Sequence, residues 1–388
     1  MKTARLTFSL GLVVAVVCAW SLRQSASAAS GEEGFGDPLR GLTPAERELF
    51  IAGLDEFEEE ETAEEGLGPT FNRTGCAVCH LIPAIGGSSE IKETRGARDS
   101  GGVYHDLLGG SLFQREGINE RCRERFPETA NIRAARQSVA LFGSGLIEAI
   151  PDGQLERYAA QQRASHPEQA GRLHHVMDVA SGKSLIGRFG WKSQQASLLA
   201  FSADAYVNEM GITSRLFPEE NAPNGDMNKL AACDTIPDPE DADNAIDAFA
   251  DFMRFLAPPP RLPQGPEVDR GHTLFEKIGC EVCHHAGFTA VSAVGAINGR
   301  RVDAFSDFLL HDIGTGDGII QGEAQGLELR TAPLWGVSQS APYLHDGSAE
   351  TLERAILRHG VQAQSARDAF EALSESDQAA LLAFLESI

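Results

Sequence analysis

The sequence predicts a mostly α-helical protein of two domains, with long loops and little strand. A five-residue pattern, Cys-x-x-Cys-His, occurs twice, at residues 76–80 and 280–284. Three consecutive prolines at 258–260 separate the two copies, and such prolines end a helix and stiffen a connector. Apolar residues recur at helical spacing in both parts, whereas strand-like alternation is short and rare.

The N-terminal segment has the order of a secretory signal. Two basic residues precede an apolar run over residues 6–20, and Ala-Ser-Ala follows at 26–28 as a small-residue cleavage site. We predict that residues 1–28 are a signal peptide and that the mature protein is periplasmic; an uncleaved anchor is the alternative. No other apolar stretch approaches the roughly 20 residues of a membrane span, so no membrane association is expected after cleavage.

The composition is strongly acidic, with a formal net charge of −23. Removal of the signal peptide takes away three positive charges (Lys2, Arg5 and Arg23) and no acids, which moves the charge from −23 to −26. Nucleic acids and anionic membranes are therefore not expected as partners. A small, basic electron donor would be attracted to such a surface.

The first predicted domain spans residues 40–262. It opens with a helix that Thr43 caps, with Pro44 at the first helical position and Glu46 completing a capping box. The inward face of this helix is expected to carry residues at helical spacing: Leu49, Phe50, Gly53, Leu54 and Phe57. A closing helix before the prolines carries a second such face, formed by Ile246, Phe249, Phe252, Met253 and Leu256.

The second predicted domain spans residues 263–388. Its opening helix, which includes residues 270–275, runs almost directly into the second Cys-x-x-Cys-His. Its closing helix has Ser374 as a cap, Asp377 three residues later, and an apolar face formed by Leu381, Leu382, Phe384, Leu385 and Ile388. Because both parts begin and end alike, the sequence indicates an internal duplication that is expanded in the first copy.

Each Cys-x-x-Cys-His is the attachment pattern of a c-type haem. Two thiols at this spacing reach the two vinyl groups of one porphyrin, and the adjacent histidine binds the iron. We therefore predict two cytochrome c-like domains with one covalent haem each; a redox dithiol and a zinc knuckle are the alternatives. The predicted attachment residues are Cys76, Cys79, Cys280 and Cys283, and the predicted iron ligands are His80 and His284.

Two further cysteines, Cys122 and Cys233, remain in the mature chain. An even pair in an oxidising compartment allows a disulfide. Two separate buried thiols are the alternative, because sequence alone does not supply the geometry that a bridge requires.

The C-terminal part carries a distinctive turn followed by a helix start. Pro-Tyr-Leu-His-Asp-Gly at 342–347 precedes Thr-Leu-Glu at 351–353. Here the chain resembles the bacterial di-haem cytochrome c peroxidase superfamily, in which an axial methionine follows the turn histidine by 14 residues. His359 stands 14 residues after His345. The resemblance therefore implies that His359 is the second iron ligand opposite His284, with a lower potential than methionine would give, and His345 is the alternative.

A related arrangement occurs in the first part. Gly-Arg-Phe-Gly-Trp at 187–191, a helix start at Ser197 and Asn-Glu-Met-Gly at 208–211 are similar to the family's Phe-Trp-Asp-Gly turn, Ser-Leu-Glu helix and Glu-Met-Gly. The resemblance implies that Trp191 lies between the haems and that Glu209 lines the peroxide pocket. A carboxylate there can carry a proton during peroxide cleavage. Alternatively, Trp191 is a core aromatic and Glu209 a solvated helix end.

The first part differs from the family pattern at two points. Lysine follows Trp191 where the family has aspartate, and Glu209 comes 18 residues after Trp191, slightly closer than usual. Longer segments, at 66–72, 109–114 and 141–151, look closer to one branch, the di-haem oxidoreductases also labelled thiol oxidoreductase-like. The resemblance covers most of residues 42–388.

The resemblance does not assign a sixth ligand to the first haem. The family's peroxidases place a displaceable histidine shortly after this motif, but residues 81–104 contain none. The next histidines along the chain are His105, His174 and His175. We expect an open or weakly ligated iron.

The resemblance implies a periplasmic di-haem peroxidase. It would reduce hydrogen peroxide, or another small oxidant, at the first haem, with electrons from a small redox protein through the second. A protein-modifying oxidase that withdraws electrons from a bound partner through Trp191, and a plain electron-transfer cytochrome, are the competing classes. Family members also bind calcium through carbonyls that would fall on Ser340 and Pro342 here, and a homodimer is a candidate assembly.

Overall fold

The computed structural model describes residues 33–388, so the predicted signal peptide lies outside the described residues. Helix exceeds strand, as predicted, with 33% helix and 14% strand. The α-helices are α2 (Pro44–Glu58), α3 (Ser144–Glu148), α4 (Asp152–Ser165), α5 (Leu198–Ala205), α6 (Met227–Cys233), α7 (Ala245–Phe255), α8 (Pro266–Lys277), α9 (Leu352–Leu357), α10 (Gln364–Glu371) and α11 (Glu375–Ser387).

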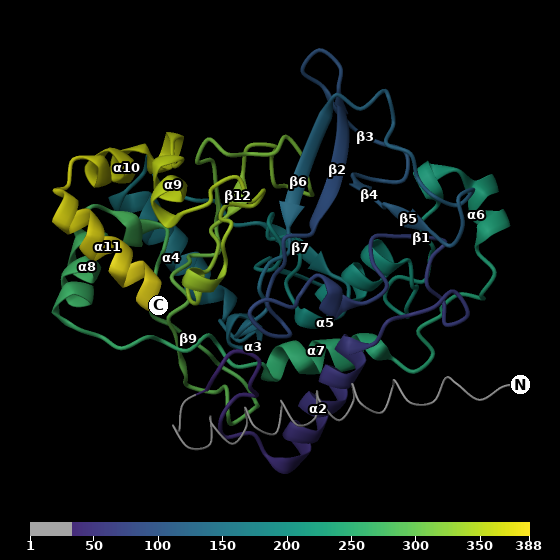
Figure 1. The fold of residues 1–388 in the computed structure, drawn as a ribbon, viewed down its shortest axis with the longest axis horizontal. Helices are drawn as coiled ribbons and strands as arrows, with labels where there is room; N and C mark the ends of the chain where they lie inside the picture. The colour runs from purple at the N-terminus through teal and green to yellow at the C-terminus, as the bar shows by residue number, and fades with distance from the viewer. Residues whose placement is uncertain (1–32) are drawn as a thin grey trace, which may run out of the picture.

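The strands form small antiparallel units, the largest of which is a four-stranded sheet. In it β2 pairs with β3, β4 and β6, and the sheet projects from the body of the molecule in Figure 1. The sequence does not predict this sheet, because β2 reads Lys-Glu-Thr-Arg-Gly-Ala-Arg-Asp, without apolar alternation. The strands are β1 (Thr70–Phe71), β2 (Lys92–Asp99), β3 (Tyr104–Asp106), β4 (Leu112–Phe113), β5 (Glu116–Gly117), β6 (Ile132–Gln137), β7 (His175–Asp178), β8 (Lys183–Ile186), β9 (Phe288–Thr289), β10 (Arg301–Val302), β11 (Leu310–His311) and β12 (Leu329–Arg330).

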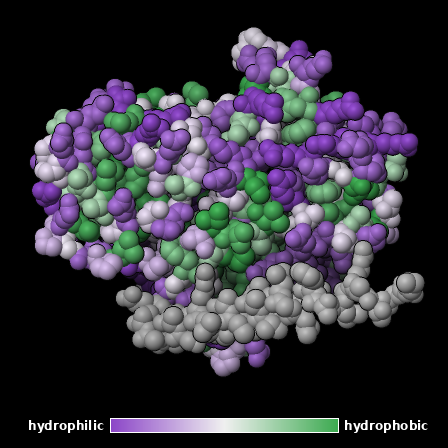
Figure 2. Space-filling model, viewed as in Figure 1, coloured by the Kyte–Doolittle hydropathy of each residue, from purple (hydrophilic) through white to green (hydrophobic). Residues whose placement is uncertain are grey.

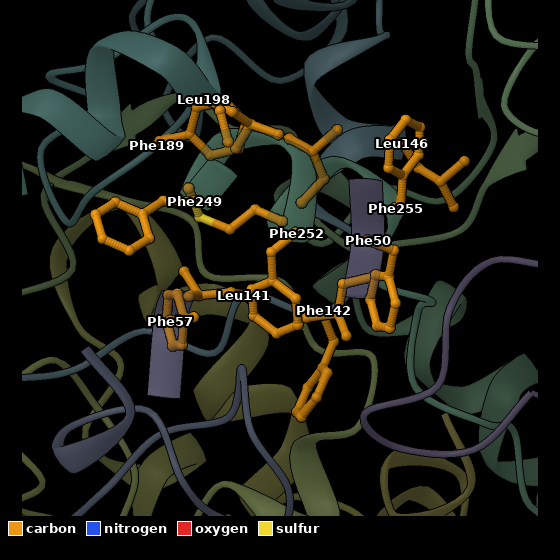
Figure 3. Packing of buried hydrophobic residues seen from close by; sticks show 14 of the residues in the cluster. Phe50, Phe57, Leu141, Phe142, Leu146, Phe189, Leu198, Phe249, Phe252 and Phe255 are labelled. Carbon is orange, nitrogen blue, oxygen red and sulfur yellow. The ribbon is translucent and has the colours of Figure 1, made fainter. Parts of the chain in front are cut away.

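Gly53 allows α2 and α7 to cross in close contact. A Cβ atom at Gly53 would lie 2.3 Å from the carbonyl oxygen of Ala248 and 2.9 Å from the amide nitrogen of Phe252. Aromatic rings pack around the crossing: the Phe252 ring centroid is 5.4 Å from that of Phe50 and 4.8 Å from that of Phe57. Figure 3 shows these rings in the main hydrophobic core.

The pair α8 and α11 repeats this crossing near the C-terminus. A Cβ atom at Gly271 would lie 2.0 Å from the carbonyl oxygen of Ala380, and the ring centroids of Phe275 and Phe384 are 5.2 Å apart. The predicted similarity between the opening and closing helices of the two parts is therefore confirmed in their packing.

The predicted helix starts are also confirmed. Thr43 and Glu46 form a reciprocal capping box, and the Ser374 hydroxyl accepts a hydrogen bond from the Asp377 amide. The prediction of the inward face is wrong for one residue, Leu49, which is 47% exposed. The buried stripe of α2 is narrower than predicted and contains Phe50, Gly53, Leu54 and Phe57, which α7 covers.

Residues from both sides of the three prolines pack together. The main hydrophobic cluster includes Phe288 and Phe308 from the second predicted domain. Conversely, α4 of the first part lies beside the C-terminal helices in Figure 1, and the Tyr158 hydroxyl donates to the carbonyls of Glu281 and Val282. The two parts therefore share an interface beyond their connector, and the boundary at 262/263 stays a prediction.

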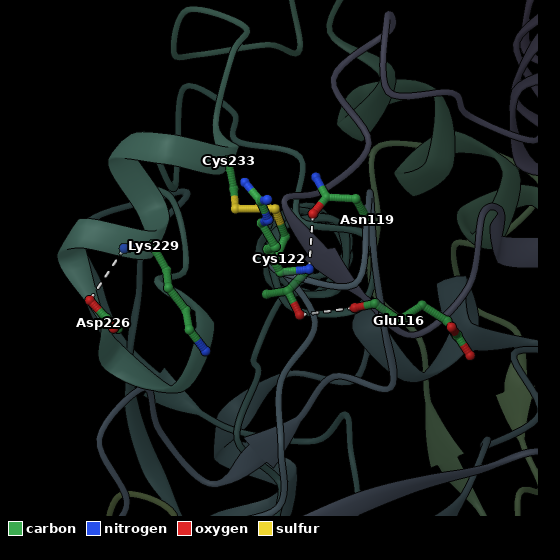
Figure 4. The surroundings of a disulfide bond; sticks show 8 residues. Glu116, Asn119, Cys122, Asp226, Lys229 and Cys233 are labelled. Atoms are coloured by element: carbon green, nitrogen blue, oxygen red, sulfur yellow. Dashed lines mark hydrogen bonds between the residues drawn. A yellow bond between two sulfur atoms is a disulfide. The ribbon is translucent and has the colours of Figure 1, made fainter.

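A disulfide joins Cys122 to Cys233, with Cα atoms 5.8 Å apart (Figure 4). Of the two readings that the sequence leaves open, the structure has the bridged one. The bond connects residues 111 apart in the chain and holds the end of α6 to the segment before β6. The four cysteines of the Cys-x-x-Cys-His motifs are not disulfide-bonded.

Within residues 33–388, the structure contains no helix with the length and apolar character needed to cross a bilayer. Hydrophilic residues cover much of both ends of the face seen in Figure 2, and hydrophobic residues gather near its centre.

The crossing of α2 and α7 gives a stability prediction. Gly53→Ala is expected to lower the free energy of unfolding by about 1–3 kcal/mol, because the backbone of α7 leaves no room for a methyl group. Gly153→Ala in α4 is the matched control: a Cβ atom there meets only a side-chain nitrogen of Arg157, at 3.5 Å. This control should change the free energy by less than about 1 kcal/mol. Urea denaturation measures both, and equal losses would contradict the tight crossing.

Candidate haem sites and active site

The first Cys-x-x-Cys-His forms a short turn in the wall of a cavity of about 390 Å³. The 3₁₀ turn η1 (Cys76–Val78) leads into Cys79, and the amides of Cys79 and His80 both donate to the carbonyl of Cys76. All three motif side chains line the cavity. His80 Nδ1 lies 2.9 Å from the carbonyl oxygen of Gly87, which makes Nδ1 the N–H and leaves Nε2 free to bind a metal.

The second motif has the same local form beside a cavity of about 270 Å³. The turn η4 (Cys280–Val282) leads into Cys283, and the His284 amide donates to the carbonyl of Cys280. His284 Nδ1 lies 3.0 Å from the carbonyl oxygen of Phe305. On the same cavity, His359 Nδ1 lies 2.8 Å from the carbonyl oxygen of Ala355. Both histidines therefore keep Nε2 free, in the tautomer that metal ligands adopt.

The separation of His284 and His359 fits one metal ion between them. Their ring centroids are 6.4 Å apart, and their planes meet at 55°. Two metal–nitrogen bonds of about 2 Å, with about 1.1 Å from each nitrogen to its ring centre, give about 6.2 Å. Burial, together with the neighbouring His359 ring, lowers the pKa of His284 to about 4, so its imidazole is neutral, as metal ligation requires. The second site therefore fits a bis-histidine haem iron.

The two thiols of the first motif do not have the surroundings of a redox dithiol. Burial raises the pKa of Cys76 to about 12 and that of Cys79 to about 11, whereas reactive dithiols have lowered values. Among residues 33–388, the side-chain groups that could hold one metal ion are Cys283 with Asp307 and His311, and Glu220 with Asp238 and Glu240. Neither group combines the two cysteines and the histidine of one motif, so the donors fit haem better than zinc.

Two carboxyl groups meet on the wall of the first cavity. Glu209 lies in η2 (Tyr206–Met210), a π-helical turn that continues α5, and Glu93 lies in β2. Both carboxyl groups line the cavity, and each is among the neighbours that shift the pKa of the other. The Asn72 side-chain amide donates to Glu209 Oε2 at 2.6 Å. Arg95 donates to both Glu93 oxygens, at 2.6 and 3.1 Å.

These surroundings shift the pKa values of the two carboxyl groups in opposite directions. Burial, and next the neighbouring Glu93, raises the pKa of Glu209 to about 8. For Glu93, burial acts in the same direction, but Arg95 and Arg136 outweigh it and the pKa is lowered. At neutral pH the pair therefore holds one proton, on Glu209, so that an acid and a base lie side by side.

Comparison with models of protein families shows to which family the chain belongs. A family model described as "Di-haem oxidoreductase, putative peroxidase" matches residues 115–388. The chain belongs to this family. The second Cys-x-x-Cys-His lies within the matched residues and the first lies before them. Among curated protein sequences, none matches the chain significantly.

Three solved structures resemble this chain at low sequence identity. Hydrazine synthase from Kuenenia stuttgartiensis is 15% identical, with a TM-score of 0.41, over 92% of this chain and 90% of that chain. A MauG-like protein associated with microbial copper homeostasis is 17% identical, with a TM-score of 0.33, over 64% and 88%. The di-haem peroxidase BthA from Burkholderia thailandensis is 15% identical, with a TM-score of 0.32, over 73% and 91%. Because these scores are low, the family assignment rests on the family model.

His80 is the one histidine among the described residues that line the first cavity. His105, in β3, and His175, in β7, are exposed. His174 is buried, but its Nδ1 lies 2.7 Å from the carbonyl oxygen of Lys192 and its Nε2 accepts from the Glu323 amide. The sixth ligand of the predicted first haem, and its open or weakly ligated state, stay predictions.

Trp191 lines both cavities, and its place between two haems stays a prediction. Its indole N–H donates to the carbonyl of Gln137 at 2.8 Å, and its ring meets that of His345 edge to face, with centroids 6.1 Å apart. Trp191 and His345 hold equivalent places in the two parts, each six residues before a helix cap, at Ser197 and Thr351. His345 therefore lines the second cavity beside Trp191, whereas the ring next to that of His284 is that of His359.

Lys192, which departs from the family's aspartate, belongs to a buried ionic network. Its ammonium lies 3.3 Å from Asp317 Oδ1 and donates to the carbonyl of Glu328. Asp317 Oδ2 accepts from Arg136 Nε at 2.7 Å. Arg136 lines the first cavity, and its Nη2 is buried without a hydrogen-bond partner. That unused donor is suited to a haem propionate, which supports haem as the occupant of the cavity.

The two predicted calcium ligands, Ser340 and Pro342, both line the second cavity. Calcium binding there stays a prediction.

Sequence reasoning misses three residues of the carboxyl pair and its supports: Asn72, Glu93 and Arg95. The last two lie in a charged segment without a recognised motif, 13 and 15 residues after His80. Their one signal is the two-residue interval, which places both on the same face if the segment is a strand.

Proposed function

We propose that the protein is a periplasmic di-haem c-type peroxidase that reduces hydrogen peroxide. The reaction takes place in the first cavity, at a haem attached to Cys76 and Cys79 and ligated by His80. Electrons enter from a small redox protein through a second haem, attached to Cys280 and Cys283. The iron ligands of this second haem are His284 and His359.

The observation that carries this proposal is the carboxyl pair on the first cavity. Glu209 and Glu93 line a cavity to which the described residues bring no second histidine, so a peroxide molecule can reach both the metal side and a proton carrier. In the second cavity, the ring centroids of His284 and His359 are 6.4 Å apart, the spacing expected of two imidazoles that bind one six-coordinate iron. One site is suited to catalysis and the other to electron transfer.

A bound haem would supply the iron that polarises peroxide and the electrons that cleave its O–O bond. The chain supplies the protons. The acid form of Glu209 donates one to the departing oxygen, and the pair regains one from the oxygen that stays. Asn72 holds Glu209 in place through its side-chain amide, and Trp191 lies between the two cavities.

Electron paramagnetic resonance of the oxidised, haem-loaded protein tests this proposal. We expect one low-spin bis-histidine signal and one high-spin or weakly ligated signal, and the latter should change on addition of cyanide. Steady-state assay with a reduced small cytochrome should show peroxide-dependent oxidation. Two low-spin signals that do not respond to cyanide or peroxide would refute a catalytic role and leave an electron-transfer cytochrome.

A protein-modifying oxidase is the second candidate, and the position of Trp191 favours it. An indole between two haem cavities is able to pass an electron or hold a radical on the way from a bound partner. If the protein reacts with peroxide but does not oxidise a reduced cytochrome, and a covalently altered partner protein is trapped instead, this second reading replaces the first.

A further inference from the structure

We propose that Glu93 is a positioning residue for proton transfer, which acts by keeping a proton on Glu209 so that the pair works as one acid–base unit. This inference rests on the proposed peroxidase function of the first cavity and deepens it. It assigns a role to a strand that the sequence motifs do not include.

Two arginines, one on β2 and one on β6, hold Glu93 in the charged form. Arg95, two residues later on the same face of β2, donates to both Glu93 oxygens, and Arg136 on the paired strand β6 has Nη1 3.9 Å from Oε1. Arg95 is itself fixed by donating to the Ser111 hydroxyl at 3.1 Å. Two guanidinium groups therefore stabilise one carboxylate beside the cavity.

Glu209 is held so that its carboxyl group meets Glu93. The Asn72 backbone amide donates to the Glu209 carbonyl at 2.7 Å, and the Asn72 side-chain amide donates to Glu209 Oε2 at 2.6 Å. Asn72 Oδ1 in turn accepts from the Arg115 amide at 3.2 Å. Asn72 donates to Glu209 Oε2, and any hydrogen bond from Glu209 to the neighbouring Glu93 carboxylate requires a proton between them, because two carboxylates have only acceptors.

The elements around the pair carry charges of both signs. Besides Glu93 and Glu209, the charged groups on the cavity wall are Lys92 and Arg95 of β2, Arg136 of β6, Asp204 of α5, and Arg73 and Arg115 in the connecting segments. Among these charged neighbours Glu93 raises the pKa of Glu209 most, so its removal is the change that Glu209 should sense most strongly.

The proton balance shows what the pair would do. Reduction of hydrogen peroxide to two water molecules breaks the O–O bond and takes up two electrons and two protons. The electrons come from the reduced redox protein, through the haems. Glu209 gives its proton to the departing oxygen, the pair recovers a proton from the other oxygen, and solvent supplies the two protons of the full cycle. A lone carboxylate could not hold a proton ready and accept another at the same time.

Infrared spectroscopy of the haem-loaded protein tests the pair without any substrate. In the difference spectrum between the wild type and Glu209→Gln, the carbonyl band of a protonated carboxylic acid should persist to about pH 8. The Glu220 carboxyl group, whose pKa burial raises to about 9, is common to both proteins and cancels in this difference. Glu93→Gln should lower the midpoint of that band by at least about one pH unit, because a like charge has gone. Glu93→Asp keeps the charge and should hold the midpoint within about half a unit of wild type.

The same variants are then compared in single-turnover reaction with peroxide. Glu93→Gln should move the alkaline limb of the rate–pH profile to lower pH by the same interval as the infrared midpoint, with both haem spectra retained. Glu90→Gln, an exposed residue three positions earlier, makes the same charge change and should move neither. A purely structural role for Glu93 would change the rate at every pH alike.

Two outcomes overturn the proposal. One is an infrared band in Glu93→Gln that titrates as in the wild type; the other is an unshifted rate–pH profile in that variant. Failure of the peroxidase function is distinguishable, because the infrared titration would then behave as expected while no variant, nor the wild type, reacts with peroxide. If Glu93→Gln does not fold, Glu93→Asp remains decisive: loss of the band near neutral pH despite the retained charge would also refute the pair.

Discussion

Glu209→Gln is expected to lower the single-turnover rate with hydrogen peroxide by about 10²- to 10⁴-fold, the usual contribution of a positioned acid–base group. Glutamine keeps the size of the side chain and a carbonyl oxygen for the Asn72 amide, but it cannot exchange a proton with peroxide. Peroxide should therefore bind without being cleaved. Stopped-flow absorbance of the haem bands measures the rate, and unchanged spectra before mixing would show that both haem sites are intact.

The matched control is Glu219→Gln, an exposed position ten residues later in the chain. It makes the same change in charge outside the cavity and should leave the rate unaltered. If Glu209→Gln reacts at the wild-type rate, Glu209 is not the proton carrier, and another group on the cavity wall must take that role.

His359→Ala is expected to convert the second haem from a low-spin to a high-spin iron or to a new ligand set. The His284 and His359 rings are 6.4 Å apart, so both imidazoles can bind one iron between them. Loss of the His359 imidazole would leave His284 as the one remaining histidine ligand of that iron. Both haems should remain attached, because the four motif cysteines are unchanged. Electron paramagnetic resonance and the visible spectrum of the oxidised protein report the ligand change, and mass spectrometry reports the attachment.

His345→Ala is the companion variant. Its ring lies against Trp191, so its removal should leave the second haem low-spin. The reverse pattern, in which His359→Ala keeps the low-spin signal and His345→Ala loses it, would make His345 the ligand.

The sequence predicts the parts of the fold whose rules are local. The capping box at Thr43 and the cap at Ser374 follow from short-range hydrogen bonding, and the faces of α7 and α11 follow from helical spacing. The exposed Leu49 departs because the width of a buried stripe depends on how much of a helix its partner covers, which is a tertiary property.

Some residues of the candidate site can also be predicted from local motifs, whereas others depend on tertiary contacts. Cys76, His80 and Glu209 belong to recognisable short motifs, so their chemistry is readable from the sequence. Glu93 and Arg95 are not, because their strand is composed of charged residues that are stabilised only by one another and by Arg136 of β6. Ion pairing across a cavity is a long-range arrangement that residue type and spacing do not specify.

The wall that the two cavities share has a thermodynamic consequence. Residues 137–139, at and after the end of β6, and Trp191 line both cavities, so the two sites cannot respond independently to any displacement of that wall. Linkage makes such a dependence mutual. If reduction of the second haem tightens ligand binding in the first cavity by a given factor, ligand binding there must raise the potential of the second haem by the equivalent free energy. A redox titration in the presence and absence of cyanide therefore measures, from one side, what a binding titration measures from the other.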